Sequence, residues 1–216
     1  MVTTDATQQQ TTAENTPTHT TSGCKKVVVV GDGSCGKTCL LMSIIERDAP
    51  DGYVPTVFET YVKEIDHGKT SYEVSFYDTA GQDVYDRLRP LSYPDTDVFL
   101  VCFAVDSPDS LYNAYDKWTP EVKHFGPNVP FVLVGTKCDL RSDESTLKRL
   151  RKAKQEVITQ EEGREMAKKL KASAYVECSA LTGFNVNEVI STALKSALKK
   201  QHKQLNKLKQ LRCTFL

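Results

Sequence analysis

The stretch that decides the fold is Val27-Val28-Val29-Val30, followed by Gly31-Asp32-Gly33-Ser34-Cys35-Gly36-Lys37-Thr38. The four valines predict a buried strand, because a short β-branched run that ends at a glycine is typical of one. The eight residues after it fit the pattern G-x-x-x-x-G-K-[ST], and helical spacing follows from Lys37 to Arg47. A glycine-rich loop between a strand and a helix wraps its N–H groups around phosphate. The sequence therefore predicts a phosphate-binding loop, in which Lys37 reaches the β- and γ-phosphates and Thr38 binds Mg²⁺.

Along the rest of the chain, segments with a strand pattern alternate with segments that have helical spacing. The further predicted strands are Val57–Ile65, Tyr72–Tyr77, Val98–Val105, Val129–Val134 and Tyr175–Cys178. The further predicted helices are Leu111–Phe125, Gln160–Lys171 and Asn187–Lys200. Asp66-His67-Gly68-Lys69 lies between the first two of these strands and predicts the turn of a hairpin. This alternation predicts an α/β fold, with a six-stranded, mostly parallel sheet that has helices on both faces.

The two ends of the chain differ in composition from the segment between them. Residues 1–24 are rich in Thr and Gln and contain no Lys or Arg. They predict a disordered tail, because such a segment has little apolar surface to bury. Residues 25–194 are predicted to form one domain, for which 39% hydrophobic residues in the whole chain are enough. Residues 195–216 are predicted to form a basic tail. Seven Lys and Arg residues precede Cys213 in it, and no acidic residue lies among them.

Composition excludes several classes of protein. The longest uncharged apolar run, Val98–Val105, is too short to span a bilayer. The seven cysteines are an odd number without a C-x-x-C spacing, and the first residues lack the charged and apolar regions of a signal peptide. We therefore expect reduced thiols in the cytosol and no disulfide framework. No aromatic residues interleave the bases of the tail, so we expect no nucleic-acid partner.

Three further motifs follow predicted strands. They are Asp78-Thr79-Ala80-Gly81-Gln82, Thr136-Lys137-Cys138-Asp139 and Ser179-Ala180-Leu181. In an open parallel sheet, ligands bind at the carboxyl ends of the strands. We therefore expect all three motifs on the same edge as the phosphate loop. There an acid could hold Mg²⁺ through water, and a glycine N–H could reach a γ-phosphate.

With these motifs in this order, the chain resembles the Ras-superfamily small GTPases, and the Rho family in particular. The Rho resemblance is carried by Tyr53-Val54-Pro55-Thr56-Val57-Phe58-Glu59, by Asp86-Arg87-Leu88-Arg89-Pro90-Leu91-Ser92-Tyr93-Pro94 and by Trp118-Thr119-Pro120-Glu121. It covers about residues 25–216. The charged stretch of about residues 142–156 lies where Rho proteins carry an insert helix. The resemblance implies a P-loop GTPase fold with that extra helix.

The resemblance also implies roles for individual residues. Thr38 and Thr56 would ligate Mg²⁺, and Asp78 would hold it through water. Gln82 would orient the attacking water, with Lys37 and Thr56 as the other catalytic residues. Asp139 would accept the N–H groups of the guanine edge, which adenine cannot supply. The implied nucleotide-binding residues are Gly31, Asp32, Gly33, Ser34, Cys35, Gly36, Lys37, Thr38, Cys39, Tyr53, Thr56, Gly81, Thr136, Lys137, Asp139, Ser179, Ala180 and Leu181.

The function that the resemblance implies is a GTP/GDP switch that hydrolyses GTP slowly and is stimulated by an activating protein. The implied partners are exchange factors, GTPase-activating proteins, a guanine-nucleotide dissociation inhibitor, and effectors such as formins or kinases that act on the actin cytoskeleton. Two alternatives belong to other classes. A GTP-locked adaptor is disfavoured by Gln82 and Gly33, and a P-loop ATPase or kinase is disfavoured by Asp139.

Two further features, one in the basic tail and one inside the predicted domain, add expectations. Cys213-Thr214-Phe215-Leu216 fits C-a-a-X, and a final Leu favours geranylgeranyl on Cys213. Together with the basic tail, this predicts the cytoplasmic face of the plasma membrane, with a cytosolic pool and an association with the cytoskeleton. Ala49 stands where similar GTPases place a Phe that packs against guanine. We therefore expect faster nucleotide release than in those relatives.

Overall fold

Six strands form one sheet in the order β2-β3-β1-β4-β5-β6. The structure is a computed structural model, and it describes residues 20–46 and 56–199. The strands are β1 Thr20–Gly31, β2 Phe58–His67, β3 Thr70–Thr79, β4 Val98–Ala104, β5 Phe131–Thr136 and β6 Ala174–Glu177. β2 and β3 form an antiparallel hairpin, and the other neighbouring pairs are parallel. This confirms the predicted α/β fold with a six-stranded, mostly parallel sheet.

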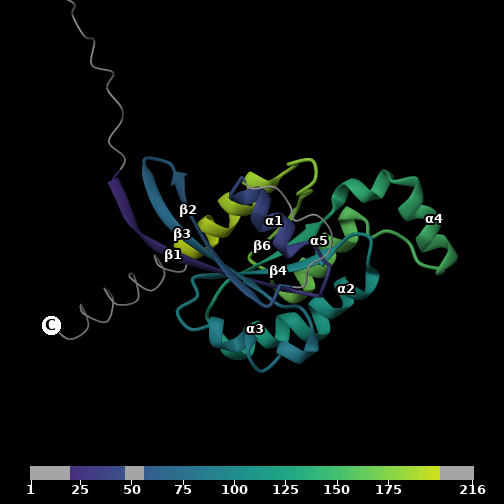
Figure 1. Ribbon diagram of the computed structural model, residues 1–216, viewed down its shortest axis with the longest axis horizontal. Helices are drawn as coiled ribbons and strands as arrows, with labels where there is room; N and C mark the ends of the chain where they lie inside the picture. The colour runs from purple at the N-terminus through teal and green to yellow at the C-terminus, as the bar shows by residue number, and fades with distance from the viewer. Residues whose placement is uncertain (1–19, 47–55, 200–216) are drawn as a thin grey trace, which may run out of the picture.

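Val27–Val30 contribute side chains to two hydrophobic cores, one on each face of the sheet. Successive side chains of a strand point to opposite faces of its sheet. Val27 and Val29 accordingly belong to one buried cluster, whereas Val28 and Val30 belong to the other. The first cluster packs under α1 (Lys37–Ile44) and a last helix over residues 186–199, and Figure 1 shows both on one side of the sheet.

The second core lies under a longer helical segment and α5 (Gln160–Leu170). The single helix predicted at Leu111–Phe125 is three consecutive pieces: α2 (Pro108–Asn113), a π-helical turn η3 (Ala114–Trp118) and α3 (Thr119–Phe125). Short 3₁₀ turns complete the fold: η1 Asp83–Tyr85, η2 Arg89–Ser92 and η4 Cys138–Ser142. Among the described residues, no helix is both long and apolar enough to cross a membrane.

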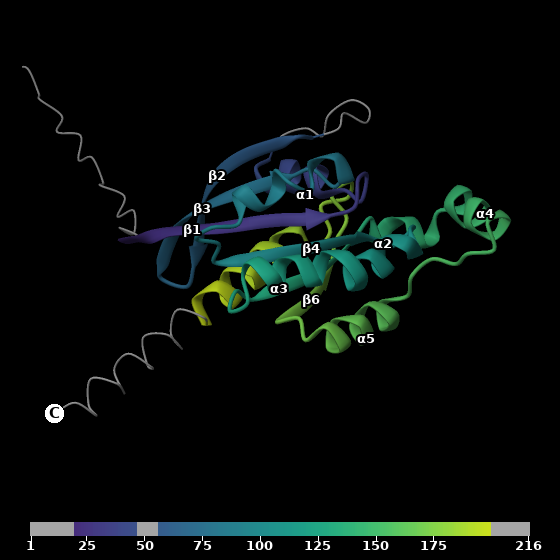
Figure 2. The ribbon, with the colours of Figure 1, turned by 90° about the horizontal axis from the view of Figure 1, so that it is seen from below.

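The predicted insert is a helix, α4 (Glu144–Lys152). The side chain of Asp143 caps it by accepting a hydrogen bond from the Thr146 N–H at 2.7 Å. The helix is shorter than the charged stretch of about residues 142–156 from which it was predicted, because it ends before Ala153. α4 projects from one end of the molecule, and the last described helix ends at the opposite end (Figure 2).

Most predicted boundaries shift by one to three residues; the hairpin turn, for example, is shorter than predicted, because Asp66 and His67 belong to β2. Two of the wrong boundaries have a clear physical reason. The disordered tail was predicted to reach residue 24, but β1 begins at Thr20. Thr20 and Thr21 pair with Thr70 and Ser71 of β3, because the long β2–β3 hairpin offers a partner edge beyond the valine run. β5 begins at Phe131 and not at Val129. Pro130 has no N–H for the ladder, so the strand starts after it.

Candidate nucleotide-binding site

The phosphate loop joins β1 to α1 at the carboxyl edge of the sheet. Gly36 adopts a left-handed φ of 87° just before the helix, a conformation that favours glycine. The Lys37 ammonium folds back over the loop and donates to the carbonyl oxygens of Gly31 and Asp32, both at 2.8 Å. A Cβ on Gly81 would lie 2.3 Å from the Gly33 nitrogen, so the strand-end motif of β3 contacts the loop directly.

The three predicted Mg²⁺ residues converge beside this loop. The Thr38 hydroxyl donates to Asp78 Oδ2 at 2.6 Å and lies 2.8 Å from the Thr56 hydroxyl. Burial raises the pKa of Asp78, against the opposing effects of the Thr38 hydrogen bond and the Lys37 charge. The other carboxylate oxygen, Oδ1, is buried and has no hydrogen-bond partner within the described ranges. Oxygen donors of this kind fit Mg²⁺, which favours carboxylates and hydroxyls together with phosphate oxygens.

The base motifs line a single cavity of about 220 Å³. The predicted residues on its wall are Gly36, Cys39, Thr136, Lys137, Asp139, Ala180 and Leu181. Leu40, Leu140 and Cys178 also line it, although they were not predicted. Ser179 is fully buried, and its hydroxyl accepts a hydrogen bond from the Thr182 N–H at 3.1 Å. Ser179 therefore fixes the loop that carries Ala180 and Leu181, instead of facing the cavity.

Buried and half-buried side chains hold the walls of the base cavity. The Thr136 hydroxyl lies between the carbonyl oxygens of Cys35 and Phe103 and connects β5 to the phosphate loop. Arg141 makes two parallel hydrogen bonds to Glu177 at the end of β6. Lys137 has a left-handed φ of 57°, and its ammonium lies 3.7 Å from Asp106 Oδ1. These contacts join three strand ends, so the cavity is formed before any base enters it.

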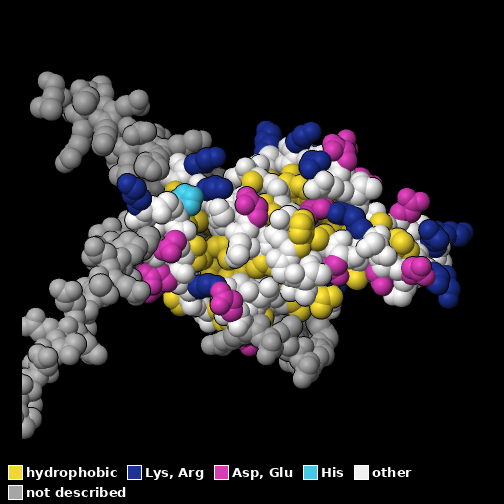
Figure 3. Space-filling view, turned by 90° about the horizontal axis from the view of Figure 1, so that it is seen from above, with side chains coloured by type: hydrophobic (Ala, Val, Ile, Leu, Met, Phe, Trp, Pro, Cys, Tyr) yellow, Lys and Arg dark blue, Asp and Glu magenta, His cyan; other side chains and the backbone are white. Residues whose placement is uncertain are grey.

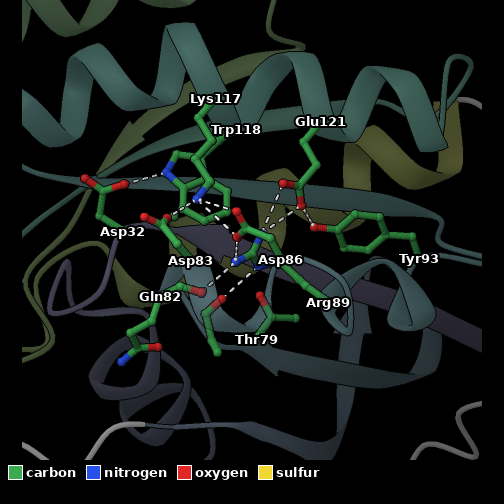
Figure 4. A network of polar contacts seen from close by, with 12 residues as sticks. Asp32, Thr79, Gln82, Asp83, Asp86, Arg89, Tyr93, Lys117, Trp118 and Glu121 are labelled. Atoms are coloured by element: carbon green, nitrogen blue, oxygen red, sulfur yellow. Dashed lines mark hydrogen bonds and ion pairs between the residues drawn. The ribbon is translucent and has the colours of Figure 1, made fainter.

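Gln82 lies three residues after the end of β3, in the segment that we call the second switch (residues 81–92), and Arg89 holds the backbone there. The Arg89 side chain is fully buried. Its Nε donates to the Ala80 carbonyl at 2.8 Å and its Nη2 to the Gln82 carbonyl at 3.3 Å, so it grips the chain on both sides of Gly81. Glu121 of α3 pairs with the same guanidinium. The Gln82 side chain points away from this cluster (Figure 4).

Three predicted loop residues have side chains that contact other parts of the protein or solvent. The Asp32 carboxylate accepts hydrogen bonds from Trp118 Nε1 at 2.6 Å and from Asn113 Nδ2 at 2.8 Å. The Cys35 thiol is buried against the Cys102 carbonyl, and burial raises its pKa. Ser34 is exposed and has a φ of 61°. These residues would bind phosphate through their backbone N–H groups. Tyr53 lies outside the described residues.

The sequence model of the Ras family matches residues 26–199, which is well over half of the chain. The chain belongs to the Ras family. Proteins of this family are small GTPases that switch between GTP- and GDP-bound states, bind these nucleotides with Mg²⁺, and interact with exchange factors, GTPase-activating proteins and effectors. The phosphate loop, the converging Mg²⁺ residues and the base cavity supply the parts that this chemistry needs.

In a Ras-family GTPase the transferred phosphoryl group is loosely bound and charged, so positioning and charge neutralisation dominate catalysis. Thr38, Thr56 and Asp78 would hold Mg²⁺, which when bound would neutralise charge on the phosphate oxygens. Lys37 would exchange its present carbonyl partners for phosphate oxygens. Gln82, whose backbone Arg89 fixes, would orient the attacking water. Each of these assignments stays a prediction that mutagenesis can test.

Sequence reasoning missed the residues that support the site from other elements. Asn113 and Trp118 hold Asp32, Asp106 faces Lys137, and Glu121 pairs with Arg89. Trp118 and Glu121 were quoted only as part of the Rho resemblance. No local pattern marks any of the four, because each acts on a residue far away in the sequence.

Proposed function

We propose that this Ras-family GTPase is Rho-like, and that its GTP state engages effectors that control the actin cytoskeleton. The observation that carries the proposal is α4, which lies between η4 and α5, where the resemblance places the insert helix. Leu150 of α4 is buried, and Arg149 pairs with Asp106 at 2.7 Å. α4 is thus a packed element of the domain, and charged side chains gather at its end of the molecule (Figure 3).

A surface for partners lies next to Gln82. A cavity of about 410 Å³ opens between the start of β2 and the second switch. Apolar side chains that are half or more exposed stand on or beside it: Val57, Phe58, Val84, Leu88 and Leu91. Exposed apolar patches of this kind mark protein interaction sites. Because it combines the segment that follows Thr56 with the second switch, this surface is where we place the effectors and exchange factors.

We further propose that an activating protein supplies an arginine for hydrolysis. Two arginines near the site are already paired, Arg89 with Glu121 and Arg141 with Glu177. Neither is available to a γ-phosphate. An arginine from a partner raises the rate roughly 10³–10⁵-fold in Ras with its activator, and we expect a similar gain here.

The C-terminal tail lies outside the described residues, and its role is part of the proposal. A prenyl chain on Cys213 with the seven nearby bases would supply the two signals that stable membrane anchoring requires. The last helix ends opposite α4 (Figure 1), so an anchored tail would leave α4 facing the cytosol. We expect Cys213→Ser to shift the protein from membranes to the cytosol. Unchanged membrane association after cell fractionation would contradict the anchor.

The experiment that tests the proposed function has two stages. The first compares binding of GTP and ATP and follows one turnover of bound GTP; preference for ATP would contradict the role of Asp139. The second compares the proteins retained by the chain loaded with a GTP analogue and with GDP. Retention of actin-regulating effectors by the GTP-analogue form alone is the expected result. Equal retention by both forms would contradict the switch.

A further inference from the structure

Lys117 lies between the second switch and the phosphate loop (Figure 4). Its ammonium bonds to Asp83 at 2.5 Å and to Asp86 at 3.1 Å. Asp83 follows Gln82 directly and begins η1. Lys117 therefore ties Asp83 of the exposed turn to α3's neighbouring turn η3, while Arg89 also bonds to Asp86 at 2.7 Å.

The same residue leads to the phosphate loop through its neighbour. The Lys117 ammonium lies 4.8 Å from the centre of the Trp118 ring. Trp118 Nε1 in turn donates to the Asp32 carboxylate at 2.6 Å. A continuous path thus runs from Asp32 through Trp118 and Lys117 to Asp83.

The two adjacent residues of this path come from an irregular turn. Lys117 and Trp118 both lie in the π-helical turn η3 (Ala114–Trp118). π-turns are frequent at functional sites. The helical spacing of the sequence did not predict this irregularity.

We propose that Lys117 is a positioning residue for GTP hydrolysis, which acts by holding Asp83 and thereby the conformation of Gln82. Without the ammonium, Asp83 would lose this ion pair, whereas Asp86 would keep its bond to Arg89. Burial alone would lower the pKa of Lys117, but its bonds to Asp83 and Asp86 raise it above the usual value. The side chain is therefore charged throughout the physiological range, and the path is a permanent one and not a pH switch.

The first test is single-turnover hydrolysis by protein loaded with GTP. We expect Lys117→Gln to slow hydrolysis about 3- to 10-fold, with GDP affinity within about twofold of wild type. Lys117→Arg should hydrolyse GTP at the wild-type rate, because it keeps the charge. The matched control is Lys123→Gln on α3, which removes the same charge from a lysine that bonds to the Leu170 carbonyl, away from the switch.

A second variant removes the contact from the other side. The Asp83 side chain is 89% exposed, so Asp83→Asn leaves packing intact and should slow hydrolysis as Lys117→Gln does. The double variant Gln82→Leu/Lys117→Gln should hydrolyse GTP no more slowly than Gln82→Leu, since Lys117 acts through Gln82. An equal loss in both backgrounds would overturn the proposal, as would a wild-type rate in Lys117→Gln.

Trp118 provides a spectroscopic readout, because it is the only tryptophan in the chain. We expect its emission to differ between protein loaded with GDP and with a GTP analogue. Asp83→Asn should remove at least about half of that difference, because the switch no longer reaches Lys117. A difference of full size in Asp83→Asn would contradict the path. Absence of GTP hydrolysis in wild type would instead contradict the family activity, so the two failures can be told apart.

Discussion

The two sides of the nucleotide site are held by different forces. On the base side, the buried Thr136 bridges β5 and the phosphate loop, and Arg141 pairs with the buried Glu177. On the switch side, the buried Arg89 holds the backbone at Gln82, but the 3₁₀ turn that follows is exposed, and its ion pair between Lys117 and Asp83 is open to solvent. Buried contacts are costly to break, whereas exposed ion pairs contribute little each.

This difference matches the work of each side. A base cavity that is already formed can hold guanine in both nucleotide states. The exposed turn after Gln82, which is held by weak and separable contacts, can change conformation when the γ-phosphate is lost, because a few kcal/mol decide between its states. Mutations on the base side should therefore change affinity, and mutations on the switch side should change hydrolysis.

The largest effect is expected for Gln82→Leu. Activator-stimulated hydrolysis should be lost, which is a decrease of roughly 10³-fold or more. Nucleotide affinity should stay within a few-fold, because Gln82 acts on water and not on ground-state binding. Single-turnover hydrolysis with activator and GDP titration measure the two quantities. Normal stimulated turnover would remove Gln82 from the mechanism, and a large loss of affinity would break the division between the two sides.

Asp139→Asn should produce the reverse pattern. The carboxylate would accept two N–H groups of guanine, and an amide would place a donor against one of them. One hydrogen bond would be replaced by a contact between two donors and the other would lose its charge, which together amount to roughly 3–4 kcal/mol, or about 150- to 1,000-fold in GDP affinity. Hydrolysis of GTP that is already bound should change by less than about threefold. Equilibrium binding and single-turnover hydrolysis of the same preparation test both statements, and Asp143→Asn on the nearby helix cap is the control.

The parts of the fold and the site that depend on local sequence pattern could be predicted. Val27–Val30 and the glycine-rich loop predicted a strand, a turn and a helix, and strand-end motifs predicted the edge where Asp78 and Asp139 lie. Boundaries and cross-chain supports were not predictable in the same way. The Thr-rich segment at Thr20 becomes strand only because the β2–β3 hairpin is long enough to pair with it.

The contact between Trp118 and Asp32 could not be predicted from the sequence, for a physical reason. Trp118 and Asp32 are 86 residues apart, and a tryptophan N–H can donate to many possible acceptors. Which one it finds depends on the π-helical turn η3, and helical spacing alone predicts an ordinary helix there. The sequence argument therefore assigned Asp32 to the phosphate, while its carboxylate serves the wall behind the loop.

A third prediction concerns Ala49, which lies outside the described residues. A Phe there would pack against the base and add contact from the switch side. The gain is about 2–3 kcal/mol, combining aromatic contact with burial. Ala49→Phe should therefore release a fluorescent guanine nucleotide about 30- to 150-fold more slowly than wild type. Release that is no slower would mean that another side chain already fills the position.

The smallest effect is expected for Asp106→Asn, and it tests whether the base side reaches as far as α4. Asp106 Oδ1 is buried, has no hydrogen-bond partner within the described ranges, and faces the Lys137 ammonium at 3.7 Å. Oδ2 bonds to Arg149 of α4 at 2.7 Å. Asn keeps the shape but loses the charge that orients Lys137 along the base cavity.

Because both partners are partly exposed, the loss should be modest, about 2- to 5-fold faster GDP release. Asp109→Asn is the control, since it neutralises an exposed acid of α2 close by in the sequence. Hydrolysis of bound GTP should not change in either variant. If Asp106→Asn slowed hydrolysis and left release unchanged, Asp106 would belong to the switch side, and the boundary between the two sides would have to be redrawn through β4.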